Sequence, residues 1–182
     1  GYQLDGEELV ERLLKSNKKN TIPKLFDNIN TTIIVNLTKI YLEKNSYLEK
    51  LVGEFDIKNS KLFLAKVDSI LENKKKFSYY YRTTNKNEKI TNIFIQEPRS
   101  FINNYKFIKG FEEGELELNS MKIENNSRSN LKITNFKVKE VPVLAKILTL
   151  ASLQGIADLL TGEGIRFDEF EMDFKSKNNL TE

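Results

Sequence analysis

The chain has 182 residues, enough for one domain with its own core, and 39% of them are hydrophobic. Its 29 basic and 26 acidic residues leave a net charge of +3, too small and too dispersed for a strong nucleic-acid footprint. The absence of cysteine and histidine excludes disulfides and thiol chemistry, and it removes the commonest general base and metal ligand.

Residues 1–30 predict an amphipathic helix followed by a linker. Asp5 and Glu8 resemble a capping box, in which the side chains satisfy the free N–H groups of a first helical turn. Leu9–Leu14 then supplies one apolar stripe, and Pro23 prevents a simple continuation of the helix. Two roles stay open for this helix: covering the end of a sheet, or binding a partner.

Residues 31–97 predict a meander of four or five antiparallel strands, because apolar residues recur with a period of two between polar turns. The apolar phase changes between Leu37 and Ile40, which predicts a bulge or a turn there. Lys58-Asn59-Ser60 is typical of a turn between two strands. Further along, the alternating residues are Phe77, Tyr79, Tyr81, Ile93 and Ile95.

Residues 98–140 predict a short helix followed by a hairpin. Apolar residues between Pro98 and Ile108 fall at helical spacing, and Gly110 is the expected end of that helix. Glu115–Ile123 and Leu131–Val138 are the expected strands of the hairpin, with its turn at Glu124-Asn125-Asn126.

Residues 141–182 predict a long apolar helix followed by a strand. Pro142 suits a first helical turn, and Gly162 and Gly164 mark the end. At ~27 Å the helix approaches a membrane span, but Asp158 lies inside it. Three placements stay open: buried across the sheet, lining or plugging a lipid groove, or spanning a membrane. Alternation from Ile165 to Phe174 predicts the strand.

Together these patterns predict a mainly β fold, α+β by content: a curved antiparallel sheet or groove with about eight strands and three helices. The three helices are the N-terminal one, the middle one and the long apolar one near the C-terminus. We treat residues 1–182 as a single segment, divided at 1–30, 31–97, 98–140 and 141–182.

Four stretches carry a resemblance to a known family. The most specific runs from Pro142 to Phe174, PVLAKILTLASLQGIADLLTGEGIRFDEFEMDF. LDGEELVERLL, FIKGFEEGELELN and LKITNFKVKEVPVL, which begin at Leu4, Phe107 and Leu131, follow the same order and spacing. The chain thus resembles the AsmA-like C-terminal region of bacterial envelope lipid-transfer proteins. It departs in composition, because Asn and Lys replace Gly, Arg or Ala at many positions, and its middle, Thr31–Ile95, is generic β pattern.

The resemblance implies a protein on the periplasmic side of the bacterial inner membrane, built as an elongated β-groove whose apolar side takes phospholipid acyl chains. It implies inter-membrane lipid transport and outer-membrane homeostasis, with membrane attachment through other parts of the protein. Because the chain lacks an initiator Met, we expect it to be a segment of a longer protein. The alternative is a structural or protein-interaction module of the same envelope protein, with a closed core and no lipid groove.

The residue patterns predict no enzyme, cofactor or metal site. Alternation of Glu169, Glu171 and Asp173 is typical of a solvated strand face, with a cation or acid–base site as the alternative. No serine has a histidine partner, and Gly162-Glu163-Gly164 lacks the further glycine of a phosphate loop.

Lys74–Arg82 is the best candidate for nucleic-acid binding, because basic residues stand beside alternating aromatic ones. Alternating aromatic residues on a strand are more often core or cross-strand pairs, and the lysines could instead meet anionic headgroups. We expect no nucleic-acid partner, and the sequence indicates no specific protein partner. The residues expected to contact lipid are Ile33, Val35, Leu37, Phe55, Ile57, Leu62, Leu64, Leu144, Leu148, Ala151, Ile156 and Leu159.

Overall fold

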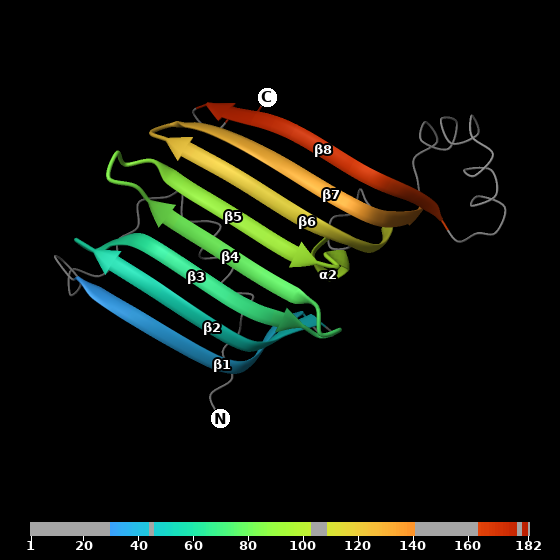
Figure 1. Cartoon of the computed structure of the whole chain (residues 1–182), viewed down its shortest axis with the longest axis horizontal. Coiled ribbons are helices and arrows are strands. Elements are labelled where there is room, and N and C mark those ends of the chain that lie inside the picture. Colours follow the sequence, from blue (N-terminus) through green and yellow to red (C-terminus); the bar gives the residue numbers. More distant parts are fainter. Residues whose placement is uncertain (1–29, 44–45, 103–108, 141–163, 178–179, 182) are drawn as a thin grey trace.

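The computed structural model describes residues 30–43, 46–102, 109–140, 164–177 and 180–181. They form one open antiparallel sheet in which the strands follow one another in chain order (Figure 1). Eight strands are long, as the sequence predicts, and β9 has two residues. Their bounds are β1 Thr31–Glu43, β2 Ser46–Lys58, β3 Lys61–Leu71, β4 Lys76–Thr83, β5 Lys89–Gln96, β6 Lys109–Ile123, β7 Asn126–Glu140, β8 Ile165–Lys177 and β9 Leu180–Thr181.

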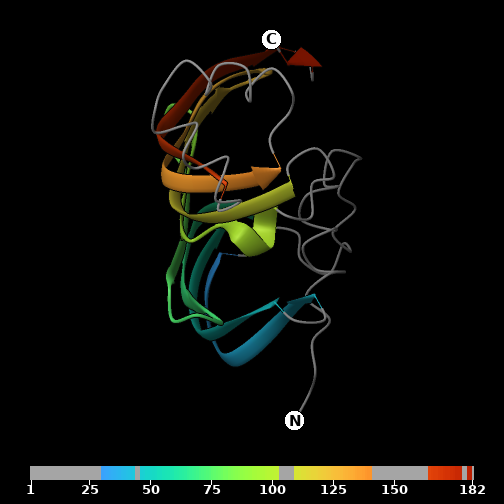
Figure 2. The same ribbon diagram turned by 90° about the vertical axis from the view of Figure 1, so that its right-hand side faces the viewer.

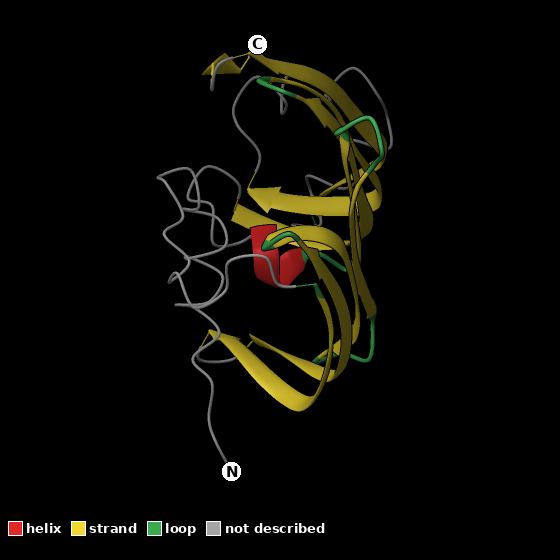
Figure 3. Cartoon of the chain, turned by 90° about the vertical axis from the view of Figure 1, so that its left-hand side faces the viewer, coloured by secondary structure: helices red, strands yellow, loops and turns green. Residues whose placement is uncertain are grey.

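The sheet is strongly curved, and the single helix of the described residues, α2 (Arg99–Ile102), lies on its concave side (Figures 2 and 3). This confirms the mainly β class. The predicted middle helix from Pro98 to Ile108 is found over four residues, and residues 103–108 lie outside the described part. The predicted N-terminal helix and the helix over 142–161 also lie outside it, so the count of three helices has no support here.

Direct pairing between neighbours holds from β1 to β8, and it fixes which side chains share a face. In antiparallel strands, residues directly opposite each other point to the same side of the sheet. Val35 pairs with Gly53, Gly53 with Val67, and the same row continues through every strand to β8. The alternation in the sequence therefore becomes one apolar and one polar face.

The predicted phase change in β1 is accommodated by a bulge in its neighbour, β2. Glu49 pairs with Ile70 and Val52 with Asp68, so two residues of β2 stand opposite one of β3. Lys50, inside this bulge, has a φ of 51°. As a result, residues of both phases pack on one cluster, in which the buried members Leu48 and Leu51 are joined by Val35, Leu37, Ile40 and Leu42.

Two predicted turns are confirmed. Asn59 and Ser60, with φ values of 49° and 59°, connect β2 to β3. Glu124 and Asn125 connect β6 to β7, and both strands extend further than expected. The expected helix end at Gly110 is wrong, because this residue lies in β6, where its φ of 69° suits an irregular strand start.

Gly114 lets β6 pass closely over β7. Its φ is 82°, and an added Cβ would lie 2.8 Å from the Cβ of Phe136 and 3.0 Å from the carbonyl oxygen of Thr134. An alanine there meets both backbone strain and a backbone clash, which the neighbours cannot relieve by a rotamer change.

We expect Gly114→Ala to lower the free energy of unfolding by about 1–3 kcal/mol in urea denaturation. Glu117→Ala, an exposed change in the same strand, is the matched control and should stay within about 0.5 kcal/mol of the wild type. Equal stability of the two variants would contradict the close approach at Gly114.

Candidate functional site

The concave face carries an apolar row that crosses eight strands. Its members are joined by direct pairing from strand to strand, so all of them point to one side of the sheet. With strands ~4.8 Å apart, seven spacings make the row about 34 Å long. The row is Val35, Gly53, Val67, Tyr79, Ile93, Leu118, Leu131 and Met172.

The convex face carries polar residues at the adjacent register positions. Only Ile34, at the edge, and the phenol of Tyr80 interrupt a row of charged and amide side chains. The row is Ile34, Glu54, Lys66, Tyr80, Asn92, Asn119, Asn130 and Asp173. A single-residue slip in register would exchange these two rows, so the contrast between the faces also specifies the register.

One border of the concave row is filled by α2. The Phe101 ring stacks on Phe77 with centroids 5.8 Å apart. Phe101 packs against a buried cluster that includes Leu71 and Ile95, which are 2% and 5% exposed. Ile102 belongs to a second buried cluster, with Phe111 as its most buried member. The helix thus joins two clusters and closes this side of the concave face.

The second cluster contains a stack of three phenylalanines from three strands. Phe111 on β6, Phe136 on β7 and Phe167 on β8 lie with centroids 5.3 and 5.1 Å apart and interplanar angles of 12°. Asn135, next to Phe136, has a φ of 52°. Ile133 and Phe136 are three positions apart and would point to opposite faces of a regular strand, but both are buried. The irregular strand ends therefore bring extra rings into the core.

The rest of the concave row is less covered. Val67, Ile93, Leu118 and Leu131 are half-buried although they occupy the middle of the sheet. Val35, at the β1 end, is also half-buried, and exposure rises at the β8 end, to 41% for Met172. The face therefore has a filled part beside α2 and an accessible apolar part along the row.

A row of hydroxyl groups lies on the other border of the apolar row. Tyr81, Thr91, Ser120 and Ser129 pair directly with one another on four neighbouring strands. Ser120 Oγ lies 2.8 Å from Ser129 Oγ, and the Tyr81 hydroxyl lies 3.1 Å from Thr83 Oγ1. From the border beside α2 to the opposite border, the concave face thus presents buried core, then accessible apolar side chains, then hydroxyl groups.

The structure places six of the twelve residues expected to contact lipid on the concave face. Val35 and Leu37 pack on the cluster under α2, and Ile33, Phe55 and Ile57 share their face through pairing. Leu62 pairs with Ile57 and is 38% exposed. Leu144, Leu148, Ala151, Ile156 and Leu159 lie outside the described residues.

Leu64 does not share the concave face with the other described residues of this set. It pairs with Asp56 and Arg82, so it points to the convex face. The cause is a register shift: Ile57 pairs with Leu62 but Asp56 with Leu64, which leaves Phe63 as an extra residue in β3. Sequence reasoning therefore missed Ala65 and Val67, which continue the concave rows. Their positions alternate with those of Leu62 and Leu64, so a pattern that starts from the leucines passes over them.

The predicted solvated face of β8 is confirmed. Glu169, Glu171 and Asp173 are all exposed on the convex side. Lys132 Nζ lies 2.8 Å from Glu169 and this contact raises the pKa of Lys132, while Asn130 Nδ2 donates to both other carboxylates. Within the described ranges, no group of three or more acidic residues is arranged to hold a metal ion.

The nucleic-acid pattern is divided between the two faces. Phe77 and Tyr79 point to the concave side, and burial together with the neighbouring Tyr81 raises the pKa of the Tyr79 phenol. Lys76 and Arg82 alternate with them and point to the convex side. Of the β4 rings, Tyr80 alone shares the face of these cations, so the alternating rings and the cations form no common platform.

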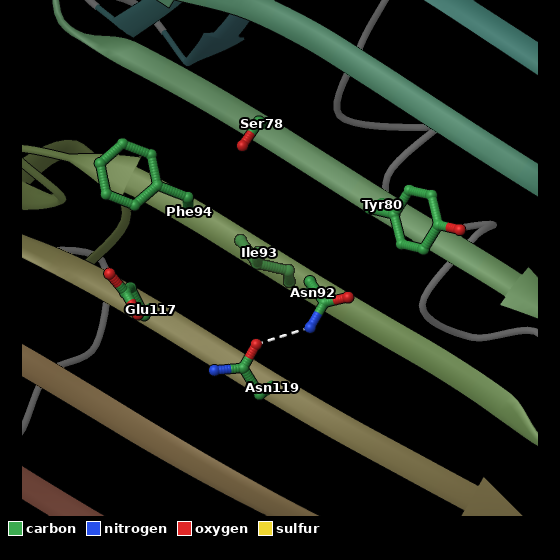
Figure 4. A pocket seen from close by; sticks show the side chains of 7 residues that line it. All are labelled: Ser78, Tyr80, Asn92, Ile93, Phe94, Glu117 and Asn119. Carbon is green, nitrogen blue, oxygen red and sulfur yellow. Dashed lines mark hydrogen bonds between the residues drawn. The ribbon is translucent and has the colours of Figure 1, made fainter.

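A shallow hollow of about 190 Å³ lies on the convex face (Figure 4). The rings of Tyr80 and Phe94 lie on either side of Asn92, whose Nδ2 donates to Asn119 Oδ1 at 2.5 Å. Glu117 is the one carboxylate among the lining residues. The hollow offers amide and ring contacts, and no pair of acidic groups for acid–base chemistry.

Comparison with protein-family models, with curated proteins and with solved structures finds no match for this chain. Among the described residues, no helix is long and apolar enough to cross a membrane. Function is therefore argued from the concave face and from the sequence resemblance.

The division of the concave face can be tested by two truncations. Leu71→Ala empties a filled position and should lower the free energy of unfolding by about 2–5 kcal/mol. Met172→Ala, at an accessible position, should cost less than about 1 kcal/mol. Chemical denaturation of both variants measures the difference, and a similar cost at the two positions would contradict the division.

A pH effect is expected at Glu112, because a 2.8 Å contact with Lys139 lowers the pKa of this carboxyl below its ordinary 4.5. A lowered folded-state pKa adds stability above the ordinary value, and this stability is lost as the pH falls through the lowered one. Glu112→Gln should therefore cost up to about 1 kcal/mol at neutral pH and less at about pH 3.

Urea denaturation at both pH values checks this expectation. Glu124→Gln, an exposed change in the β6–β7 turn, is the control. A Glu112→Gln cost that is unchanged in acid would show that the ion pair is not its source.

Proposed function

We propose that this chain is a segment of an AsmA-like envelope protein that shelters phospholipid acyl chains on its concave face, without enzymatic activity. The proposal places it on the periplasmic side of the bacterial inner membrane, in inter-membrane lipid transport and outer-membrane homeostasis. The observation that carries it is the apolar row across eight strands, half-buried in its middle, from Val35 to Met172.

The proposed mechanism is partition of the acyl chain onto this row. Each CH₂ removed from water contributes roughly 0.8 kcal/mol, so a chain laid across the strands gains more as the row lengthens. The row of about 34 Å is long enough for one acyl chain. Because the gain is proportional to area and has no directional requirement, a chain can slide along the row.

The hydroxyl row gives the lipid an orientation. Tyr81, Thr91 and Ser120 are half-buried along one border of the apolar row, where they can donate to the ester oxygens of a glycerolipid, while Ser129 is buried against Ser120. At the filled border beside α2, Ser69 is buried and donates to the Glu49 carbonyl oxygen, and the cluster around it is apolar. The headgroup would therefore leave the concave face on the hydroxyl side and remain in water.

The second candidate is a structural module with a closed core. It is favoured by α2, whose Phe101 and Ile102 join two buried clusters across the sheet. Under this alternative the helix closes the core, and the accessible part of the row serves packing within the protein.

Leu118 and Glu117 offer a matched test, because they are neighbours in β6 that point to opposite faces. We expect Leu118→Gln to weaken binding of the fluorescent fatty acid cis-parinaric acid by about ten-fold or more, since it leaves an unpaired amide against the chain. Glu117→Gln creates the same side chain on the convex face and should leave binding unchanged.

Circular dichroism and the Tm of both variants show whether the sheet is intact. We also expect mass spectrometry to identify lipid in an organic extract of the purified wild-type chain. A wild-type chain that neither carries lipid nor binds the probe favours the closed module and overturns lipid handling.

A further inference from the structure

The two edges of the sheet differ in how they are protected from pairing. β8, whose outer side pairs only with the two residues of β9, has seven charged residues among thirteen, and such charges are a common device against edge-to-edge association. β1, at the other end of the sheet, has only Lys39 and Glu43 among thirteen. It contains no proline, and Thr31–Val35 is an uninterrupted run of β-branched residues, which favour pairing.

The one lysine of β1 is directed inward. Lys39 Nζ lies 3.9 Å from Glu49 and 3.4 Å from the centroid of the Tyr47 ring, both on β2. Thr32 likewise donates to Asp56 on β2. These contacts leave the free side of β1 without a charge over most of its length, and no described strand pairs there.

Apolar side chains are also exposed next to this edge on the convex face, as Met121 is on β6. Ile34 is 69% exposed and Val52, on the neighbouring strand, is 53% exposed. Exposed apolar residues beside an edge strand with few charges are typical of a site that pairs with another strand, and not of an edge that stays in water.

We propose that a second copy of this chain adds to the sheet at β1, antiparallel to the first, about a two-fold axis that passes through Val35 perpendicular to the sheet. The strand is self-complementary about this residue. Ile33 of each copy lies opposite Leu37 of the other, Thr32 lies opposite Thr38, and the two Val35 residues face each other.

A perpendicular two-fold axis keeps the concave faces of both copies on the same side. Val35 is the terminal member of the apolar row, so the row of one copy continues into the row of the other. The dimer would double the length of the apolar row. It rests on the composition and contacts of β1, and it holds whether or not the face binds lipid.

Light scattering of the purified chain after size exclusion tests the association. We expect twice the chain mass of 21.2 kDa, falling toward the monomer on dilution. Ile34→Lys places a charge beside the axis and should give a monomer. Met121→Lys, on the same face in the central strand β6 and 45% exposed, should remain a dimer.

A cysteine scan fixes the register, because the chain has no cysteine of its own. Facing Cα atoms of an antiparallel pair lie ~4.5–5.5 Å apart, within the reach of a disulfide. V35C should therefore form a covalent dimer under mild oxidation, and M121C should not. A wild-type monomer at every concentration, a dimer that Ile34→Lys leaves intact, or failure of V35C to cross-link each overturns the proposal.

The outcome is separable from lipid handling. Leu118→Gln lies far along the sheet from β1, so it should lose fatty-acid binding and keep the dimer, while Ile34→Lys should lose the dimer and keep binding within one copy. Loss of both properties in both variants would refute the independence of the edge and the face.

Discussion

The structure depends on one constraint: the two-residue alternation of apolar and polar side chains must stay in phase across neighbouring strands. Direct pairing achieves this from β1 to β8, so that Val35 and Met172, at opposite ends of the sheet, belong to one row. A shift of one residue in any strand would expose its apolar set and bury its charged one. The difference between the two faces, the register of the strands and the apolar row of the candidate site therefore all result from this alternation.

Two of the places where alternation breaks lie in the buried clusters. In β2 the bulge at Lys50 brings Leu48 and Leu51 to the same side. In β7, where the register does not shift, Asn135 has a positive φ, and Ile133 and Phe136 on either side of it are both buried. Bulges bend and twist a strand, so they also contribute to the curvature of the sheet. A short helix such as α2 can then contact clusters on distant strands, because the curved sheet brings them toward it.

Much of this could be predicted from the sequence. The strands, their antiparallel order, the turn at Asn59-Ser60 and the solvated face of β8 follow from local patterns that the structure obeys. Leu64 lies on the convex face because one inserted residue, Phe63, reverses the phase of β3, and no composition signal marks an insertion. Gly110 was taken as a helix end because positive φ serves helix ends and irregular strands equally.

The hydroxyl row escaped sequence reasoning for a different reason. Tyr81, Thr91, Ser120 and Ser129 come from four strands, and each is unremarkable in its own segment. They form a feature only through register, which is a property of the whole sheet. Long-range sites of this kind become visible once pairing is known, whereas clusters within one strand, such as the carboxylates of β8, are visible at once.

Adding strands to the sheet would lengthen the accessible apolar row but would not enlarge the part of the concave face that α2 covers. α2 has four residues and covers a fixed part of the face, beside Phe77 and Leu116. Each added strand lengthens the apolar row by ~4.8 Å without lengthening that cover. A sheet that grows at β1 thus gains accessible apolar surface rather than closed core. If the concave face binds acyl chains, a longer apolar row can bind more of them, and an edge strand that can pair at the end of the row is consistent with this role. A structural module with a closed core has no need for such an edge.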